Sequence, residues 1–224
     1  MHLDPGDPDL KQKLDSLKPV VGYCILIDIV GSTALKDRQK SDWLCGMLNT
    51  FSLARGYVSN FDGPLKVIGD ALMLYISANR VRSALMLFLG LCYLVQEKNN
   101  AVFRGTKAAV CLCNDVYEVS IGIPARDYYG KDIDLTARLL ASASEGEVVM
   151  NAKFAESVLT EYHELPIKTD FPDVPNIVGP WPQRFKGFSG YVSTYKLPAG
   201  GKSFDYAAER GLVLEGEVLS HGGS

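Results

Sequence analysis

The sequence predicts an α+β sandwich, in which helices pack on one mainly antiparallel sheet. Apolar runs of strand length alternate with longer segments whose apolar residues recur at helical spacing. The predicted order is strand, helix, hairpin, helix, two strands, helix and strand, and this order is typical of the α+β class. A chain of 224 residues is long enough for one domain with a full core and short appendages.

Composition divides the chain into an arm, a domain and a tail. Residues 1–18 are polar, with a weak helical pattern from Asp9 to Leu17, and we expect an arm there. Residues 19–197 carry the apolar pattern of a folded domain. Residues 198–224 are rich in Gly, Glu and Ser, which predicts a tail that is at least partly mobile.

The first predicted strand, residues 19–29, is almost continuously apolar, which suits a central strand covered on both faces. Gly31, Ser32 and Thr33 follow it, and either hydroxyl residue can cap the next helix. Three residues at i, i+4 and i+7 mark one apolar face of that helical region: Leu44, Leu48 and Phe51.

The remaining elements follow the same alternation. Residues 62–77 predict a hairpin that turns at Gly69-Asp70, and residues 79–98 predict a strongly apolar core helix. The rest of the domain is predicted as strands at 106–113, 116–123 and 147–151, helices at 132–142 and 152–159, a loop at 170–182, and a closing hairpin from 184–187 and 191–197.

Composition also excludes several classes of function. A formal charge of −3 and a pI of about 5.6 argue against a broad nucleic-acid-binding face, but not against a small nucleotide. The five cysteines are odd in number and form no metal-binding motif, so we expect reduced, mostly buried thiols in a cytoplasmic protein. No signal peptide is apparent, and the most apolar segment is too short to span a bilayer.

Asp28 is the first candidate for chemistry, because it lies at the end of a buried strand. Its carboxylate is a hard oxygen ligand suited to Mg²⁺ or Mn²⁺, and the backbone carbonyl of Ile29 is a plausible further ligand. The backbone N–H groups of residues 29–33 can hold phosphate oxygens at the start of the helix. The alternative is that Asp28 only caps that helix.

Asp70 is the second candidate, in the turn of the predicted hairpin. If that hairpin pairs beside the first strand, Asp28 and Asp70 converge at one edge of the sheet and can hold two divalent ions, Mn²⁺ or Mg²⁺. The alternative is that Asp70 is merely a turn residue, because Gly-Asp is itself a hairpin turn signal.

Three further polar residues fit a phosphate-transfer site. Asp134 and Arg138 are four residues apart on one helix and therefore share a face. They form either an exposed ion pair or a guanidinium aimed at an α-phosphate, where negative charge builds during transfer. Lys186 is either a second cation for the phosphates or an ordinary surface lysine.

Four motifs, in this order, resemble those of the class III adenylate and guanylate cyclase family. The resemblance covers residues 19–197 and implies the ferredoxin-like sandwich of that family. The motifs read Asp28-Ile29-Val30-Gly31-Ser32-Thr33, then Lys66-x-x-Gly69-Asp70, then Asp127-Tyr128-Tyr129-Gly130-x-x-Ile133-Asp134-Leu135-x-Ala137-Arg138, then Phe185-Lys186-Gly187.

The resemblance implies a division of roles between two copies of the chain. Each active site of the family lies between two cyclase domains, so one copy here implies a head-to-tail homodimer. Asp28 and Asp70 of one subunit would hold the metal ions. The other subunit would supply Lys66 and Asp127 to read the base, and Arg138 and Lys186 to stabilise the transition state.

The chain departs from the usual family motifs at two positions, and it resembles one group of cyclases more than the others. The family usually has Asn where this chain has Asp134, and an ionised carboxylate cannot donate a hydrogen bond to the ribose. Ala71 stands where adenylate and guanylate cyclases often carry Gly or Cys. As a stand-alone domain, the chain most resembles the pyrimidine cyclases of Pycsar anti-phage systems, in particular the uridylate branch, whose product acts on a separate effector.

The residues themselves leave the base open. Lys66 with Asp127 offers one donor and one acceptor, which adenine, cytosine and uracil can each satisfy. A bulky side chain beside the base could admit a one-ring pyrimidine and exclude a two-ring purine. Phe51 is the candidate for this wall, and the alternative is that Phe51 is simply a core residue. Three hypotheses follow: a uridylate cyclase making cyclic UMP from UTP, an adenylate cyclase, and a non-catalytic nucleotide-binding module.

Overall fold

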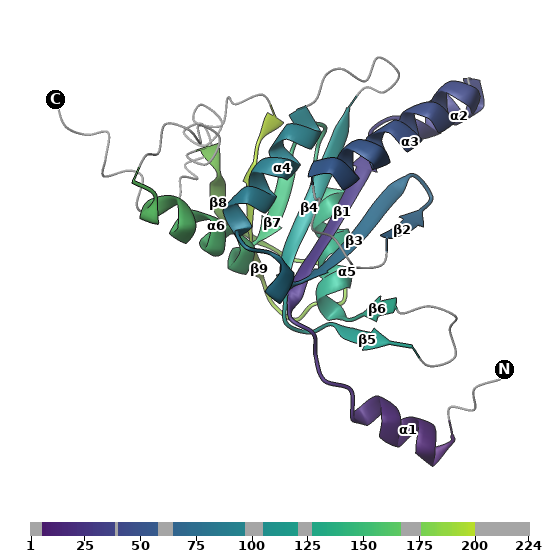
Figure 1. The fold of residues 1–224 in the computed structure, drawn as a ribbon, viewed down its shortest axis with the longest axis vertical. Coiled ribbons are helices and arrows are strands. Elements are labelled where there is room, and N and C mark those ends of the chain that lie inside the picture. Colours follow the sequence, from purple (N-terminus) through teal and green to yellow (C-terminus); the bar gives the residue numbers. More distant parts are fainter. Residues whose placement is uncertain are drawn as a thin grey trace.

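The structure is a computed structural model, and it describes residues 6–38, 40–57, 65–96, 105–120, 127–166 and 176–199. Within these ranges one large sheet runs through the molecule (Figure 1). Its seven strands are β1 (Gly22–Ile29), β2 (Leu65–Ile68), β3 (Ala71–Ser77), β4 (Thr106–Cys113), β7 (Val148–Asn151), β8 (Val178–Gln183) and β9 (Val192–Leu197), in the order β2-β3-β1-β4-β7-β9-β8.

The sheet is mainly antiparallel, as the predicted α+β class requires. β1 lies at its centre and pairs antiparallel with β3 on one side and β4 on the other. Among the described strands, β4 and β7 form the single parallel pair. The side chains of β1 are buried along almost the whole strand, which explains why it reads as a continuous apolar run.

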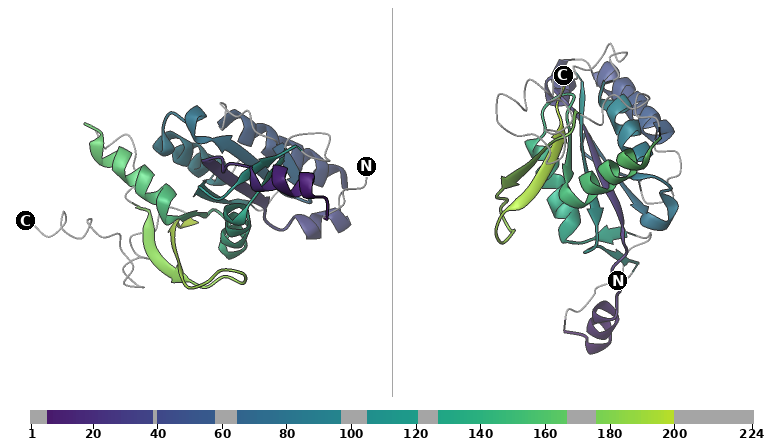
Figure 2. Two further views of the ribbon diagram at one scale, coloured as in Figure 1. Left: turned by 90° about the horizontal axis from the view of Figure 1, so that it is seen from below. Right: turned by 90° about the vertical axis from the view of Figure 1, so that its left-hand side faces the viewer.

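Helices cover the two faces of the sheet unequally (Figure 2). Three helices pack on one face around a large apolar cluster that includes Ile25, Ile27 and Phe88. Among the described helices, a single one packs on the other face, over a smaller cluster that includes Leu26, Leu135 and Leu139. The three are α3 (Lys40–Tyr57), α4 (Ala84–Gln96) and α6 (Ala152–Glu164), and the single one is α5 (Lys131–Ser142).

Carboxylate and amide side chains fix where two of these helices begin. Glu161 on α6 accepts hydrogen bonds from the backbone N–H groups of Ala84 and Leu85, and so caps the start of α4. Asn151 caps α6 by accepting a hydrogen bond from the N–H of Phe154. The first cap ties α4 and α6 together across the covered face.

The N-terminal arm is helical, as predicted. α1 (Pro8–Asp15) has no buried residue and extends away from the sheet below the start of β1 (Figure 1). A short helix, α2 (Ser32–Arg38), and a 3₁₀ turn, η1 (Ala78–Arg80), complete the described helical elements. Most of the expected tail lies outside the described residues.

Several predicted elements need correction. The strand predicted at 116–123 is described only as β5 (Tyr117–Val119), which leaves the large sheet and pairs with β6 (Asp127–Tyr129). The loop predicted at 170–182 contains all of β8 except its last residue, Gln183, and residues 184–187 form its connection to β9 rather than a strand. α4 begins five residues later than predicted, at Ala84, and α6 continues to Glu164.

The cysteine prediction is confirmed for four of the five thiols. All five are free, and burial is complete or nearly so for Cys24, Cys92, Cys111 and Cys113, whereas Cys45 is exposed. Burial raises the pKa of the Cys111 thiol, which keeps it protonated and unreactive. Across the described residues, no helix has both the length and the apolar character needed to cross a membrane.

Candidate active site

Asp28 and Asp70 lie at one end of the large sheet, next to each other across two strands. Asp28 is opposite Ala71 in the β1–β3 pairing, and Asp70 immediately precedes Ala71 in the β2–β3 turn. Gly69 in that turn has a φ of +66°, a conformation that favours glycine. The negative charge of Asp70 helps to raise the pKa of Asp28, so the two carboxylates are close enough to interact.

Asp28 is held by its own backbone and by the next strand. Its Oδ1 accepts a hydrogen bond from the N–H of Ile29 at 3.0 Å, and its Oδ2 lies 3.5 Å from Nζ of Lys107 in β4. Burial raises the pKa of Asp28. Lys107 and the N–H of Ile29 lower it by a smaller amount, so the pKa of Asp28 lies above the ordinary value for an aspartate. The surroundings therefore disfavour an ionised Asp28 carboxylate unless a cation lies close to it.

Asp70 has a lysine of its own. Nζ of Lys36, on α2, lies 3.7 Å from Oδ1 of Asp70 and 4.9 Å from the centre of the Trp43 ring. Sequence reasoning missed both Lys36 and Lys107. A signal for Lys107 exists in the sequence, because it is the one charged residue in the apolar run of β4.

The turn between β1 and α2 supplies fewer phosphate donors than predicted. The N–H of Ile29 binds Asp28, and the N–H of Val30 donates to the carbonyl of Gly105 at 2.9 Å. Gly31 has a φ of +79°, and α2 begins at Ser32. The predicted phosphate contacts therefore reduce to the backbone of Gly31, Ser32 and Thr33.

A second polar cluster joins β2 to the small sheet. Nζ of Lys66 forms an ion pair with Asp127 and lies 5.2 Å from the centre of the Tyr129 ring. Burial alone would raise the pKa of Asp127, but hydrogen bonds from Lys66, Tyr129 and the Tyr128 N–H outweigh it and hold the pKa below its ordinary value. Asp127 is therefore an ionised acceptor already paired with Lys66.

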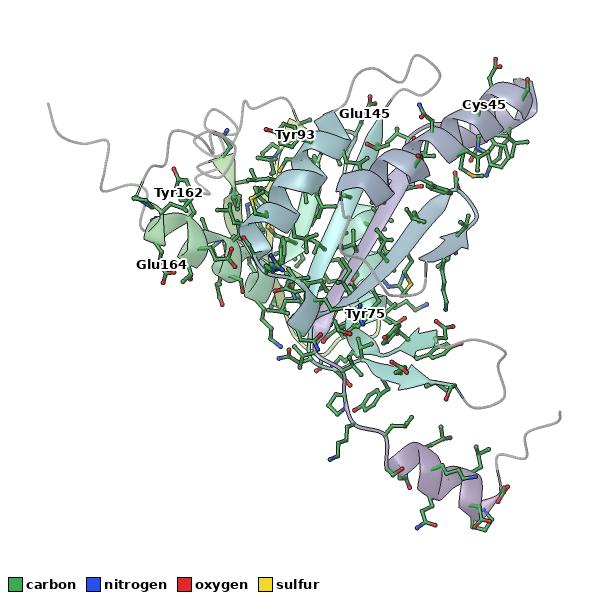
Figure 3. The ribbon with its side chains drawn as sticks, viewed as in Figure 1. Cys45, Tyr75, Tyr93, Glu145, Tyr162 and Glu164 are labelled. Atoms are coloured by element: carbon green, nitrogen blue, oxygen red, sulfur yellow. The ribbon has the colours of Figure 1, made fainter. Side chains whose placement is uncertain are left out.

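Two stacked tyrosines hold this second cluster against the large sheet. The ring of Tyr75 in β3 stacks on Tyr128 at 4.3 Å between centroids, where the large sheet meets β5 and β6 (Figure 3). The Tyr75 hydroxyl donates to the carbonyl of Val20 at 2.5 Å. A Cβ on Gly22 would lie 2.8 Å from the Tyr75 ring, so only glycine leaves room for it.

Arg138 and Lys186, the two predicted cations, lie on the less covered face of the sheet, and among the described residues neither forms an ion pair with a carboxylate. Asp134 and Arg138 are both exposed on α5, and within the described residues no ion pair joins them. Lys186 is exposed in the β8–β9 connection, whose neighbours Phe185 and Phe188 pack against the same cluster as α5. In the part of the chain that is described, neither cation contacts Asp28 or Asp70.

Phe51 is not with the other candidates. It belongs to the cluster under α3, α4 and α6, and is 9% exposed. Lys66 lies opposite Met73, which belongs to the cluster on the other face of the sheet. The sheet therefore separates Phe51 from Lys66 within one chain, and the assignment of Phe51 as a wall for the base is replaced by its alternative, a core position.

The fold is that of adenylyl and guanylyl cyclase domains, although no sequence-family model matches the chain and no curated protein matches it. The adenylyl cyclase CyaB from P. aeruginosa superimposes with a TM-score of 0.60 at 15% identity, over 83% of this chain and 97% of that one. The guanylyl cyclase Cya2 gives 0.60 at 13% identity, over 82% and 94%.

A third similar structure is a cyclase core whose specificity has been converted. The catalytic core of a rhodopsin-guanylyl cyclase with converted specificity, in complex with ATPαS, gives a TM-score of 0.57 at 16% identity, over 81% of this chain and 97% of that one. At these identities the comparisons establish the fold, and the chemistry rests on the residues.

Proposed function

We propose that this protein is a metal-dependent nucleotidyl cyclase, and that it converts a pyrimidine nucleoside triphosphate, UTP in the first place, to the 3′,5′-cyclic monophosphate and pyrophosphate. The observation that carries the proposal is the approach of Asp28 and Asp70 at one end of a sheet with the cyclase fold. The choice of UTP rests on resemblance to the uridylate cyclases and is the part to test first.

The residues present fit a pair of hard divalent ions. Asp28 and Asp70 provide carboxylate oxygens, and Ile29 provides a backbone carbonyl beside them. Among the described residues no group of three or more acidic, histidine or cysteine side chains gathers, so water and phosphate oxygens would complete the coordination. Bound Mn²⁺ or Mg²⁺ would lower the pKa of the attacking hydroxyl and neutralise the triphosphate.

The chain's own residues would place the nucleotide. Lys66 and Asp127 would bind the base edge, which requires their ion pair to open or to share its hydrogen bonds. Arg138 and Lys186 would face the α-phosphate, where charge builds as the 3′-oxygen bonds to phosphorus and pyrophosphate leaves. The 3′-hydroxyl proton passes to solvent. Asp134 would contact the ribose only as an acceptor.

A head-to-tail homodimer would bring these halves together, because within the described chain Arg138 and Lys186 do not reach the two aspartates. An Asp28→Ala chain mixed with an Arg138→Ala chain tests this arrangement. Heterodimers would contain one intact site, so random mixing should restore about a quarter of wild-type turnover. Two inactive proteins that stay inactive after mixing would argue against shared sites.

Adenylate cyclase activity is the second candidate. The Lys66–Asp127 pair can match adenine, and the similar structures include an adenylyl cyclase and a core bound to an ATP analogue. Incubating the protein with Mn²⁺ and each of the four ribonucleoside triphosphates separately decides between the candidates. Dominant cyclic UMP supports our proposal, and dominant cyclic AMP replaces it.

A non-catalytic nucleotide-binding module is the third candidate, motivated by Asp134 where the family usually has Asn. Nucleotide binding without any product in the four-substrate assay would favour it. If cyclic UMP is the product, we propose that the protein supplies a second messenger in anti-phage defence, acting on a separate effector. Cyclic UMP that rises in cells on phage infection would support that role.

A further inference from the structure

Each of the two candidate metal carboxylates faces a lysine that the proposed reaction does not use. Lys107 lies 3.5 Å from Asp28, and Lys36 lies 3.7 Å from Asp70. We infer that these lysines are built-in counter-cations, which hold the carboxylates in the metal-free protein and compete with divalent ions for them. The inference rests on the proposed function, in which Asp28 and Asp70 bind those ions.

The sheet itself fixes the first pair. Lys107 is the direct cross-strand partner of Asp28 in the β1–β4 register, so both side chains project from the same face. Their side chains are 19% and 26% exposed. A partly buried pair is screened by salt less than a surface pair, and the backbone register keeps it in place. Lys107 therefore does not behave as a freely moving surface lysine.

The second pair is held from two sides. The Lys36 ammonium lies between the Asp70 carboxylate and the face of the Trp43 ring, at 3.7 Å and 4.9 Å. A cation above an aromatic face is attracted to it, which favours this position over solvent. The Lys36 side chain is 35% exposed, so its effect should be weaker than that of Lys107.

The two lysine–aspartate pairs should weaken metal binding, because they already neutralise the charge of the carboxylates. Two carboxylates and two ammonium groups leave the metal-free site without net charge, although two ionised aspartates alone would carry −2. A divalent ion must take the same oxygens and would meet a like charge a few ångströms away. Free Mn²⁺ should therefore bind weakly, and the negative triphosphate should favour its entry, so that metal and nucleotide arrive together.

The first experiment measures binding of Mn²⁺ alone by isothermal titration calorimetry. Lys107→Met keeps the aliphatic stem and removes the charge. It should tighten Mn²⁺ binding by about tenfold, equivalent to about 1.4 kcal/mol. Lys36→Met should tighten it by about threefold, because its pair is more exposed. Asp28→Asn should abolish binding in every background.

A matched control is available in another ion pair with little exposure, between β9 and the residue that precedes β7. Lys196 in β9 lies 2.9 Å from Glu147, with side chains 13% and 8% exposed, and neither residue belongs to the proposed site. Lys196→Met should lower the melting temperature equally with and without Mn²⁺. Lys107→Met should have a lower melting temperature than the wild type in chelator. Saturating Mn²⁺ should then raise the melting temperature of Lys107→Met by more than it raises that of the wild type.

The outcomes separate this inference from the proposed function. Mn²⁺ binding that is unchanged or weaker in Lys107→Met, but lost in Asp28→Asn, overturns the counter-cation role and leaves the metal site standing. Absence of Mn²⁺ binding even in Lys107→Met overturns both the inference and the metal site. If Lys107→Met binds Mn²⁺ more tightly but the protein makes no product from any triphosphate, the counter-cation role is supported and the proposed cyclase activity is rejected.

Discussion

The two faces of the large sheet differ in what covers them and in what they carry. On one face α3, α4 and α6 enclose the larger apolar cluster. On the other, α5 and the β8–β9 connection cover a smaller cluster, and the strands there also present Asp28, Lys66 and Lys107. Because neighbouring residues of a strand point to opposite faces, one strand serves both faces at once. Stability and chemistry should therefore respond to different substitutions.

The largest expected effect is on the polar face. Asp28→Ala or Asp70→Ala should lower turnover at least about ten-thousandfold, or about 5 kcal/mol in the barrier, because the divalent ions lose a ligand. The folded state should survive, as judged by circular dichroism and melting. Asp42→Ala, at an exposed aspartate in the first turn of α3, is the control and should stay active. Retained activity in either site variant would remove the metal mechanism.

Substitutions on the face covered by α3, α4 and α6 should lower stability rather than turnover. Phe88 is fully buried in α4 within the larger cluster. Phe88→Ala should reduce the free energy of unfolding by about 3–5 kcal/mol, measured by urea denaturation, because it leaves a cavity. Turnover per folded molecule should change little below the melting temperature. A specific loss of turnover without loss of stability would break the division between the faces.

Arg138 provides a third test of the comparison between the faces, because its side chain is exposed on α5. Arg138→Ala should lower kcat about a hundredfold, or about 2.7 kcal/mol, through loss of charge stabilisation at the α-phosphate. The melting temperature should stay within about 2 °C, since exposed substitutions rarely exceed about 0.5 kcal/mol. Lys131→Ala, an exposed cation on the same helix, should retain full kcat.

The smallest effect concerns pH. The pKa of Asp28 is raised, mainly by burial, so the folded state binds its proton more tightly than the unfolded state does. The ionised carboxylate therefore opposes folding, and its cost grows as pH rises from about 3.8 through the folded pKa. In chelator, Asp28→Asn should melt slightly higher than the wild type at pH 7, and this difference should vanish near pH 3.

Sequence reasoning found the features that local patterns encode. The buried strand ending at Asp28 and the hairpin turning at Asp70 both predicted where a carboxylate would stand, and their strands do pair. It missed β8, because Pro180 and Pro182 read as loop, although an edge strand tolerates proline.

Two other misses came from tertiary neighbours. Lys107 lies 79 positions after Asp28, and only the β1–β4 register brings them together. Phe51 is predicted as a wall for the base from its bulk and its place at the end of the first helical region, but the sequence does not show which face of the sheet that helix covers.

Gly22 shows how an absent side chain can set the position of a distant one. The space above its Cα admits the Tyr75 ring, which in turn supports Tyr128 and so the neighbouring Asp127. The opening at Gly22 therefore helps to position β6, the strand that carries Asp127. Under the role proposed for Asp127, substitution of Gly22 should alter base preference through Tyr75 and Tyr128, without a contact of its own to the base.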